Sequence, residues 1–202
     1  MEKNDAEARS GRQMRTLETK FETREASDGS EDLHIAGYFA VFDGIYDMGY
    51  QMSESIDPHA FDDAISGDVR FLIDHDTRLV LGRTSAHTGE LKIDSHGLYG
   101  DVTINPKDQD AMNLYARVQR GDVNQCSFGF DILDEDAEIR EDGSIHWTIK
   151  KVKLYEVSVC TFPAYETTEV SARMNDAKNI RKRELDAWKA RMMAKIEGPK
   201  GE

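Results

Sequence analysis

The chain has 202 residues, of which 39 are acidic and 26 basic, and its net charge at pH 7 is −13. This length fits one full hydrophobic core with terminal tails. The acidic balance argues against a general nucleic-acid-binding protein, because phosphate contacts need a basic surface. No apolar run approaches the roughly 18 residues of a membrane span, and the charged N-terminus lacks a signal-peptide core, so we expect no membrane partner.

The N-terminal third of the chain reads as a polar arm followed by strands. Residues 1–16 are charged and lack apolar periodicity, so we expect a disordered arm. Alternating side chains predict strands over 17–24 and 33–42, joined as a hairpin by turn residues. Asp57 and Pro58 are typical of a helix start and predict a short helix that ends near Ser66.

Closely spaced strands dominate the middle of the chain. Strands are predicted over 69–73, 79–84, 89–93 and 98–104, a spacing typical of a barrel or sandwich. Pro106 opens a helix with acidic residues in its first turn, basic residues in its last turn and Gly121 as its stop. Its predicted buried side is formed by Met112, Tyr115, Ala116 and Val118. A strand through 126–130 and a hairpin follow, with Asp142-Gly143 as the turn and a return strand over 145–152.

The C-terminal segment has a different character. Leu185, Trp188, Met192 and Ile196 recur at helical spacing and predict an amphipathic helix over 175–196. Residues 175–202 carry eight basic and five acidic side chains, so this segment is +3 and the rest of the chain is −16. Two interpretations remain open: the helix packs on its own domain, or it is a detachable arm that docks on another protein.

The run Cys126-Ser127-Phe128-Gly129-Phe130 separates into two chemically different faces when it is read as a strand. Its cysteine and two phenylalanines line one apolar face. Ser127 and Gly129 leave the other face nearly bare around one hydroxyl, which a substrate backbone could reach. The alternative is an ordinary serine in a half-buried strand. Cys126 and Cys160 both lie in apolar strands and read as reduced core residues, with a disulfide between neighbouring strands as the alternative.

Two further residues could activate this hydroxyl. Alternation through 71–76 places His75 on the same face as Phe71 and Ile73, a pattern also typical of a core histidine. Glu156 lies inside an apolar strand, where it would share a face with Ser158. Its alternative role is an ion pair with Arg70, Arg83, Lys150 or Lys151. Hydroxyl, imidazole and carboxylate together are the parts of an activated serine nucleophile. His59, His87 and His96 fall at a helix end or in loops and are expected to be solvated.

Six segments in this order and spacing resemble the prohead (capsid maturation) proteases of tailed phages, which are serine peptidases. They are Gly37–Phe42, Glu54–Phe61, Val69–Asp76, Leu81–Thr84, Cys126–Phe130 and Glu156–Tyr165, and the resemblance covers about residues 33 to 170. It implies a mixed α/β, mainly β fold, a closed or partly closed β-barrel wrapped by helices and related to the herpesvirus assembly proteases. It also implies that His75 and Ser127 are catalytic. The herpesvirus enzymes use a second His as the third member, whereas this chain offers Glu156 at the matching late strand.

The same resemblance implies the biological setting. The expected substrates are the scaffolding segment of the major capsid protein, a separate scaffold protein and the enzyme's own tails, inside an assembling procapsid in the bacterial cytoplasm. No cofactor is expected. We predict a protease domain over 17–170 and a C-terminal helix or arm over 171–202. A metal hydrolase built on Asp74, His75 and Asp76 is disfavoured because adjacent strand residues point to opposite faces. A non-catalytic scaffold or capsid-assembly protein is the alternative function.

Overall fold

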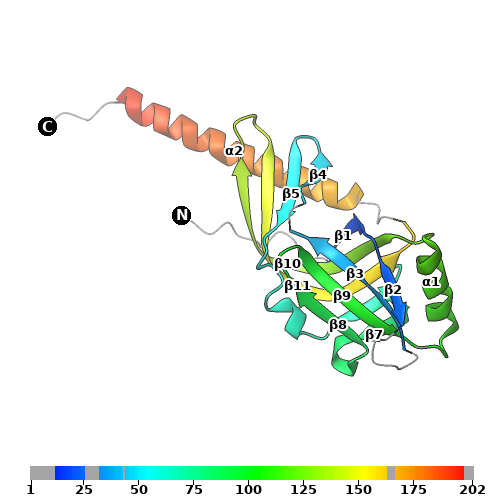
Figure 1. The fold of residues 1–202 in the computed structure, drawn as a ribbon. Coiled ribbons are helices and arrows are strands. Elements are labelled where there is room, and N and C mark those ends of the chain that lie inside the picture. The colour runs from blue at the N-terminus through cyan, green and yellow to red at the C-terminus, as the bar shows by residue number, and fades with distance from the viewer. Residues whose placement is uncertain (1–11, 26–31, 43, 163–166, 198–202) are drawn as a thin grey trace.

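The computed structural model describes residues 12–25, 32–42, 44–162 and 167–197, which form two β-sheets and two α-helices (Figure 1). The larger sheet has seven strands: β1 (Gln13–Glu18), β4 (Tyr46–Gly49), β5 (Met52–Ile56), β6 (Arg70–Ile73), β7 (Asp76–Arg83), β10 (Gln125–Ile139) and β11 (Ile145–Cys160). The smaller has four: β2 (Glu22–Glu25), β3 (Leu33–Val41), β8 (Gly89–Ile93) and β9 (Gly97–Ile104). The fold is mixed α/β and mainly β, as predicted. Of the predicted closed or partly closed barrel, the closed form is not found among the described strands, since both sheets have open ends.

The long hairpin of β10 and β11 is the centre of the larger sheet. The two strands pair antiparallel across the predicted turn at Asp142 and Gly143. The first part of β11 pairs in parallel with β5, and its last part pairs in parallel with β6. Phe128, Val157 and Val159 are buried in the main core, which the smaller sheet shares. Because side chains alternate along a strand, Ser127 and Glu156 lie on the opposite face.

The helix α1 (Gln109–Arg120) forms where it was predicted. The Asp108 side chain accepts hydrogen bonds from the backbone N–H groups of Asp110 and Ala111, and Gly121 ends the helix with a φ of 84°. The buried residues are Ala111, Leu114, Tyr115 and Val118. The predicted burial of Ala116 is wrong, because that residue faces solvent.

Three local predictions in the first half of the chain are wrong. The segment after Asp57 forms turns and a single 3-10 turn (Ala64–Ser66) instead of a helix, because so short a segment gains too few hydrogen bonds to stabilise an isolated helix. The strand expected over 17–24 is two strands, β1 and β2, in different sheets. Residues 13–16 belong to β1, although they were expected in a disordered arm; residues 1–11 lie outside the described residues.

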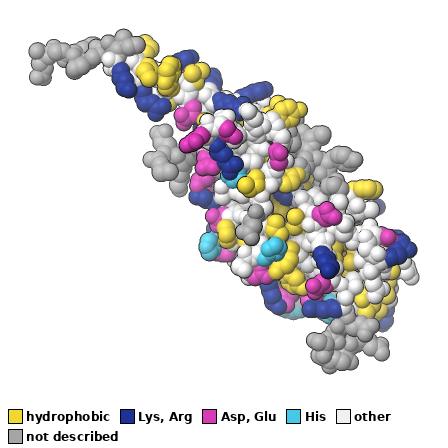
Figure 2. Space-filling view, turned by 45° about the horizontal axis from the view of Figure 1, so that its top comes forward, with side chains coloured by type: hydrophobic (Ala, Val, Ile, Leu, Met, Phe, Trp, Pro, Cys, Tyr) yellow, Lys and Arg dark blue, Asp and Glu magenta, His cyan; other side chains and the backbone are white. Residues whose placement is uncertain are grey.

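The C-terminal helix α2 (Thr167–Glu197) packs on the domain with its first half and projects with its second half. Ala177 is buried against the hairpin ends, with Met174 and Ile180 partly buried beside it. Past Arg181, which donates a hydrogen bond to the Gly143 carbonyl, the helix extends away from the sheets (Figure 1), and Leu185, Trp188 and Met193 are exposed. Figure 2 shows hydrophobic side chains at this projecting end of the molecule. The first half therefore packs on its own domain, whereas a detachable arm that docks on another protein stays a prediction for the second half. Neither described helix is long and apolar enough to span a membrane.

A buried charge cluster attaches both ends of the described chain to the domain. Glu54 on β5 accepts hydrogen bonds from Arg15 Nε and Nη2 of β1, at 2.5 and 3.0 Å. It also accepts one from Arg173 of α2, which in turn binds Glu135 at 3.0 Å and lies over the Trp147 ring. Burial by itself would raise the pKa of Glu54, but the two guanidinium groups outweigh it and lower the pKa to about 2.

Glu54→Gln is expected to lower the free energy of unfolding at pH 7 by about 3–5 kcal/mol, because two buried guanidinium groups lose their shared counter-ion. The folded pKa of Glu54 lies below its ordinary value of 4.5. Its contribution is therefore fully present above about pH 4.5 and is lost as the pH falls from there towards 2. Urea unfolding of wild type and variant at pH 7 and pH 3 measures this, with Glu138→Gln in an exposed ion pair as control. If wild type and Glu54→Gln lost the same amount of stability between pH 7 and pH 3, this prediction would be contradicted.

Candidate active site

His75 lies in the turn between β6 and β7. Asp74 and His75 both have left-handed backbone conformations, with φ of 48° and 61°, between the paired residues Ile73 and Asp76. Two consecutive residues with positive φ make the tight hairpin turn whose twist matches that of the flanking strands. The prediction that His75 continues a strand on the face of Phe71 and Ile73 is therefore wrong. The His75 ring belongs to the turn that follows β6 and not to the strand itself.

This turn is anchored on the end of β11. The Asp74 N–H donates to the Val159 carbonyl at 3.0 Å. The Asp74 carboxylate accepts from the Thr161 N–H at 2.7 Å and from the Thr161 hydroxyl at 3.1 Å. Asp76 binds Arg78 instead. Neither aspartate contacts the imidazole through these bonds, so the turn residues serve to hold His75 in place.

The His75 ring contacts Glu156 across 81 residues of sequence. His75 Nδ1 lies 2.7 Å from Glu156 Oε1, and the Glu156 side chain is almost completely buried. Ser158 donates from its hydroxyl to Glu156 Oε2 at 2.6 Å and accepts from the His75 N–H at 3.3 Å. A carboxylate on Nδ1 fixes the proton there and leaves Nε2 free to accept another.

The basic partners considered for Glu156 are engaged elsewhere. Arg70 and Arg83 pair with Asp68, Lys150 pairs with Asp136, and Lys151 pairs with Asp63. The predicted alternative, a structural ion pair between Glu156 and one of these four residues, is therefore wrong.

Ser127 lies on the same face of the sheet as Glu156 and Ser158, but its side chain is buried. It sits opposite Ser158 on β11 and opposite Thr16 on β1, and directly opposite residues share a face. Ser127 is fully buried, and its hydroxyl has no hydrogen-bond partner among the described residues. His75 Nε2 points towards Cys160 Sγ, 3.9 Å away. The structure thus joins His75 to Glu156 on the Ser127 face without a His75–Ser127 bond.

Known proteins resemble this chain in sequence and in fold. The family model for the caudovirus prohead serine protease matches residues 19–183. The chain belongs to this family. It is 30% identical over 172 residues to the prohead protease of Enterobacteria phage HK97, covering 83% of this chain and 71% of that protein. In fold it is similar to the capsid assembly protease of bacteriophage T4, with a TM-score of 0.50 at 12% identity, over 74% of this chain and 96% of the other. The protein is a serine peptidase of phage head maturation.

Cys160 is less suited than a serine to act as the nucleophile of this protease. Burial, and to a lesser extent the charges of Asp74 and Glu156, raise its pKa to about 12. The group beside His75 Nε2 is therefore a thiol at neutral pH, and the thiolate is the reactive form. Cys126 is buried on the other face of the sheet, where burial also raises its pKa. Both cysteines are free, in agreement with the predicted reduced core residues.

The other histidines lie apart from this site. His59 is exposed and pairs with Asp62, and His87 occupies a left-handed turn position. Sequence reasoning passed over His146, which is buried between the hydroxyls of Ser53 and Ser55, 2.8 Å from each. His146 stands between the apolar residues Ile145 and Trp147, and this sequence context does not indicate a polar environment.

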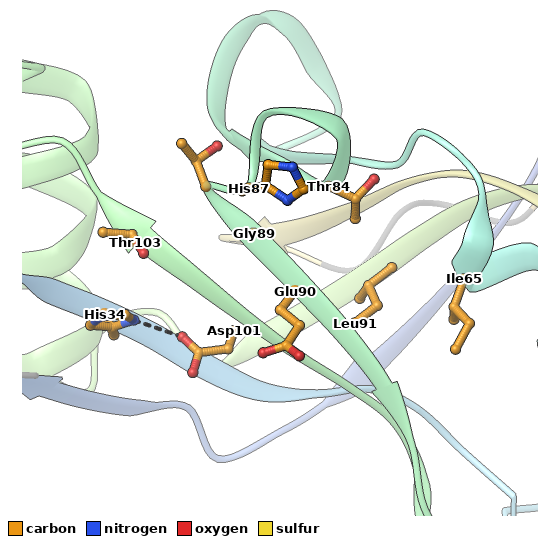
Figure 3. Close-up of a pocket in the computed structure, with 10 residues that line it drawn as sticks. His34, Ile65, Thr84, His87, Gly89, Glu90, Leu91, Asp101 and Thr103 are labelled. Atoms are coloured by element: carbon orange, nitrogen blue, oxygen red, sulfur yellow. Dashed lines mark hydrogen bonds and ion pairs between the residues drawn. The ribbon is translucent and has the colours of Figure 1, made fainter. Parts of the chain in front are cut away.

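A polar cavity of about 440 Å³ opens on the smaller sheet (Figure 3). His34 on β3 bonds Asp101 on β9 at 2.9 Å at one side of it, and Glu90 and Thr103 also line it. The lining contains none of the three predicted catalytic residues. This cavity is therefore separate from the contacts of His75.

Gly129 makes room for the Glu156 carboxylate, which lies opposite it. A Cβ on Gly129 would overlap Glu156 Oε1, so Gly129→Ala must displace the carboxylate from His75. Because small misplacements of catalytic groups cost about 10²-fold in rate, we expect a loss of that order in cleavage rate. Cleavage of co-expressed capsid protein and the thermal midpoint should be measured beside Gly67→Ala, a glycine outside the sheet. Near-normal cleavage by a folded Gly129→Ala protein would show that the carboxylate position is not critical.

Proposed function

We propose that Ser127 is the nucleophile of this protease, His75 its general acid and base, and Glu156 the group that orients His75. The Ser127 oxygen attacks the carbonyl carbon of the scissile peptide bond while its proton passes to His75 Nε2. His75 then gives this proton to the leaving amine as the C–N bond breaks, and water releases the acyl group by the same steps in reverse order. The observation that carries the proposal is the 2.7 Å contact of His75 Nδ1 with Glu156 on the sheet face of Ser127.

Two features of the site bear on how it works. His75 Nε2 faces Cys160 in this structure, so the imidazole must turn towards Ser127 before it can accept the proton. Ser158 bonds both the Glu156 carboxylate and the His75 backbone, and we assign it to holding these two groups together. The Arg83 side chain, a candidate oxyanion donor by residue type, is bound to Asp68. Backbone N–H groups near Gly129 are the remaining candidates.

A serine-reactive fluorophosphonate tests the assignment of the nucleophile directly. Ser127 is the residue expected to carry the label in peptide mapping, and Ser127→Ala is expected to remain unlabelled. Labelling of another serine in wild type, unchanged in Ser127→Ala, would overturn the assignment. Capsid-protein cleavage without any labelling of Ser127 would also overturn the assignment.

The substrates proposed for this protease are the scaffolding segment of the major capsid protein, a separate scaffold protein and the protease itself, inside the procapsid in the host cytoplasm. The names of the related proteins, a prohead protease and a capsid assembly protease, support this setting. We also propose that the fold is related to that of the herpesvirus assembly proteases. The proposed domain division keeps a protease body followed by a C-terminal helical arm.

Self-cleavage is expected ahead of α2. Residues 166–175 are polar and short of apolar anchors in the sequence, which predicts an accessible linker there and a cut between Ala164 and Lys182. That linker is wrong from Thr167 onward, because α2 begins there and a helix must unwind to enter a cleft. Residues 163–166 lie outside the described residues. We therefore expect intact-mass measurement after incubation to show loss of the segment that begins at or before Thr167, with Ser127→Ala remaining whole.

The buried Arg173 sharpens this experiment. Its contacts with Glu54, Glu135 and Trp147 would hold a severed α2 on the domain. Mass spectrometry under native conditions should then show body and helix still associated, and denaturing conditions should separate them. A wild-type chain that keeps residues 182–202 while it cleaves capsid protein would contradict self-removal of the arm.

A further inference from the structure

The strand β1 occupies the outer edge of the nucleophile strand. Six residue pairs join β1 to β10, from Gln13 opposite Phe130 to Glu18 opposite Gln125, and Thr16 lies opposite Ser127. A serine nucleophile needs space for a substrate carbonyl at its hydroxyl, yet Ser127 is fully buried. The described structure is therefore a closed form, in which an extended segment of the chain runs directly beside the proposed nucleophile.

The residue preceding β1 adds to this closure. The Arg12 side chain passes over Gly129, since its Cδ would lie 3.3 Å from a Cβ at that position, and its guanidinium lies over the Tyr155 ring at 4.4 Å. Gly129 is also where the Glu156 carboxylate lies. The segment from Arg12 to Glu18 thus covers the surroundings of Ser127 and Glu156. It precedes residue 19, where the match to the family model begins.

One side chain of β1 is held by a specific charge. Arg15, on the opposite face of β1 from Thr16, lies 5.5 Å from the Phe130 ring and makes two hydrogen bonds to buried Glu54. Arg173 is the other guanidinium that binds Glu54. If β1 leaves, Glu54 loses its ion pair with Arg15, and a buried charge with fewer partners is costly unless another cation enters.

From this arrangement we propose that the edge of β10 covered by β1 is the binding site for an extended peptide substrate, which replaces β1 as an added strand and places a basic side chain on Glu54. Such strand addition uses main-chain hydrogen bonds for affinity and alternate side chains for specificity. In the register of β1, the basic side chain stands one residue before the residue opposite Ser127. The inference rests on the proposed role of Ser127 and adds to it a substrate class and a segment that must move.

The rate at which a fluorophosphonate labels Ser127 in the full-length protein measures how open this edge is. Arg15→Gln removes the buried ion pair that holds β1, which raises the fraction of molecules in which β1 has left β10. Ser127 of this variant should therefore be labelled at least about tenfold faster than Ser127 of wild type. Arg24→Gln, which removes an exposed pair with Asp101 on the other sheet, is the matched control and should label like wild type. Leu17→Cys faces Cys126 and can lock β1 by a disulfide. The oxidised form should label at least about tenfold slower than the same protein after reduction.

A peptide of residues 12–19 tests the basic side chain in the Arg15→Gln protein. It should slow labelling, whereas the same peptide with Gln in place of Arg15 should have little effect. Equal slowing by both peptides overturns the assignment of Glu54 as the recognition group. Equal labelling of the Arg15→Gln protein and wild type, or of the locked and reduced Leu17→Cys proteins, overturns the displacement of β1. Absence of label on Ser127 in every protein would instead overturn the nucleophile assignment on which the proposal rests.

Discussion

Ser127→Ala and His75→Ala are each expected to reduce capsid-protein cleavage to background while leaving a folded protein. Ser127 is a small side chain whose hydroxyl makes no hydrogen bond among the described residues, so its removal breaks no such contact. His75 lies in a turn that Asp74 holds through its own bonds to Val159 and Thr161, so the turn should survive loss of the ring. Cleavage on gels and thermal midpoints check both expectations, with His96→Ala, an exposed loop histidine, as control.

The double variant of Ser127 and His75 gives a sharper test than either single change. Residues that act as one unit lose rate together, so the double variant should be no slower than the worse single variant. A double variant slowed by the product of the two single effects would show that the residues act independently. Near-full activity in either single variant would remove that residue from the proposed mechanism.

Glu156→Gln is expected to slow cleavage by about 10⁴-fold, by analogy with the loss seen when the orienting carboxylate of a serine protease becomes an amide. The amide is nearly isosteric, but it cannot hold the proton on His75 Nδ1 in the same way. It also changes the partner that Ser158 donates to. Because Glu156 is buried and bonded to both residues, a smaller cost in stability is expected as well.

Cleavage rate and thermal midpoint, measured together, separate orientation from structure in Glu156→Gln. Asp74→Asn provides the comparison, since Asp74 anchors the same turn without contacting the ring through its described bonds. Asp74→Asn should lower the thermal midpoint and slow cleavage far less than Glu156→Gln. An active but less stable Glu156→Gln protein would assign Glu156 to the fold and leave His75 without an orienting partner.

The sequence predicted the helix α1 because a cap, charged ends and a stop residue act within a few positions of one another. Asp108, Gly121 and most of the buried side were found as expected, whereas Ala116 proved exposed because the core side is chosen by the neighbouring strands. The same limit explains the segment after Asp57, where a good local start signal was followed by too few residues for a stable helix.

At the candidate site, too, the local sequence pattern predicted some features and the contacts between strands decided others. The two faces around Ser127 followed from period-two alternation, and Glu156 was placed on a face with Ser158 by the same rule. Alternation failed at His75, because Asp74 and His75 leave the strand in a turn of positive φ that no residue type in this run signals strongly. Gly129 was noted as a bare position, but its reason, the carboxylate of Glu156, lies on the adjoining strand.

What the sequence determined by itself is therefore local: which side chains share a strand face, where α1 begins and ends, and that the C-terminal segment is helical with an apolar stripe. The tertiary structure alone decided that His75 meets Glu156, that one buried glutamate holds both β1 and α2, and that β1 lies against Ser127. Backbone propensities and caps act over a few residues. Contacts such as His75–Glu156, 81 residues apart, are instead selected by burial and by the pairing of buried polar groups across the whole fold.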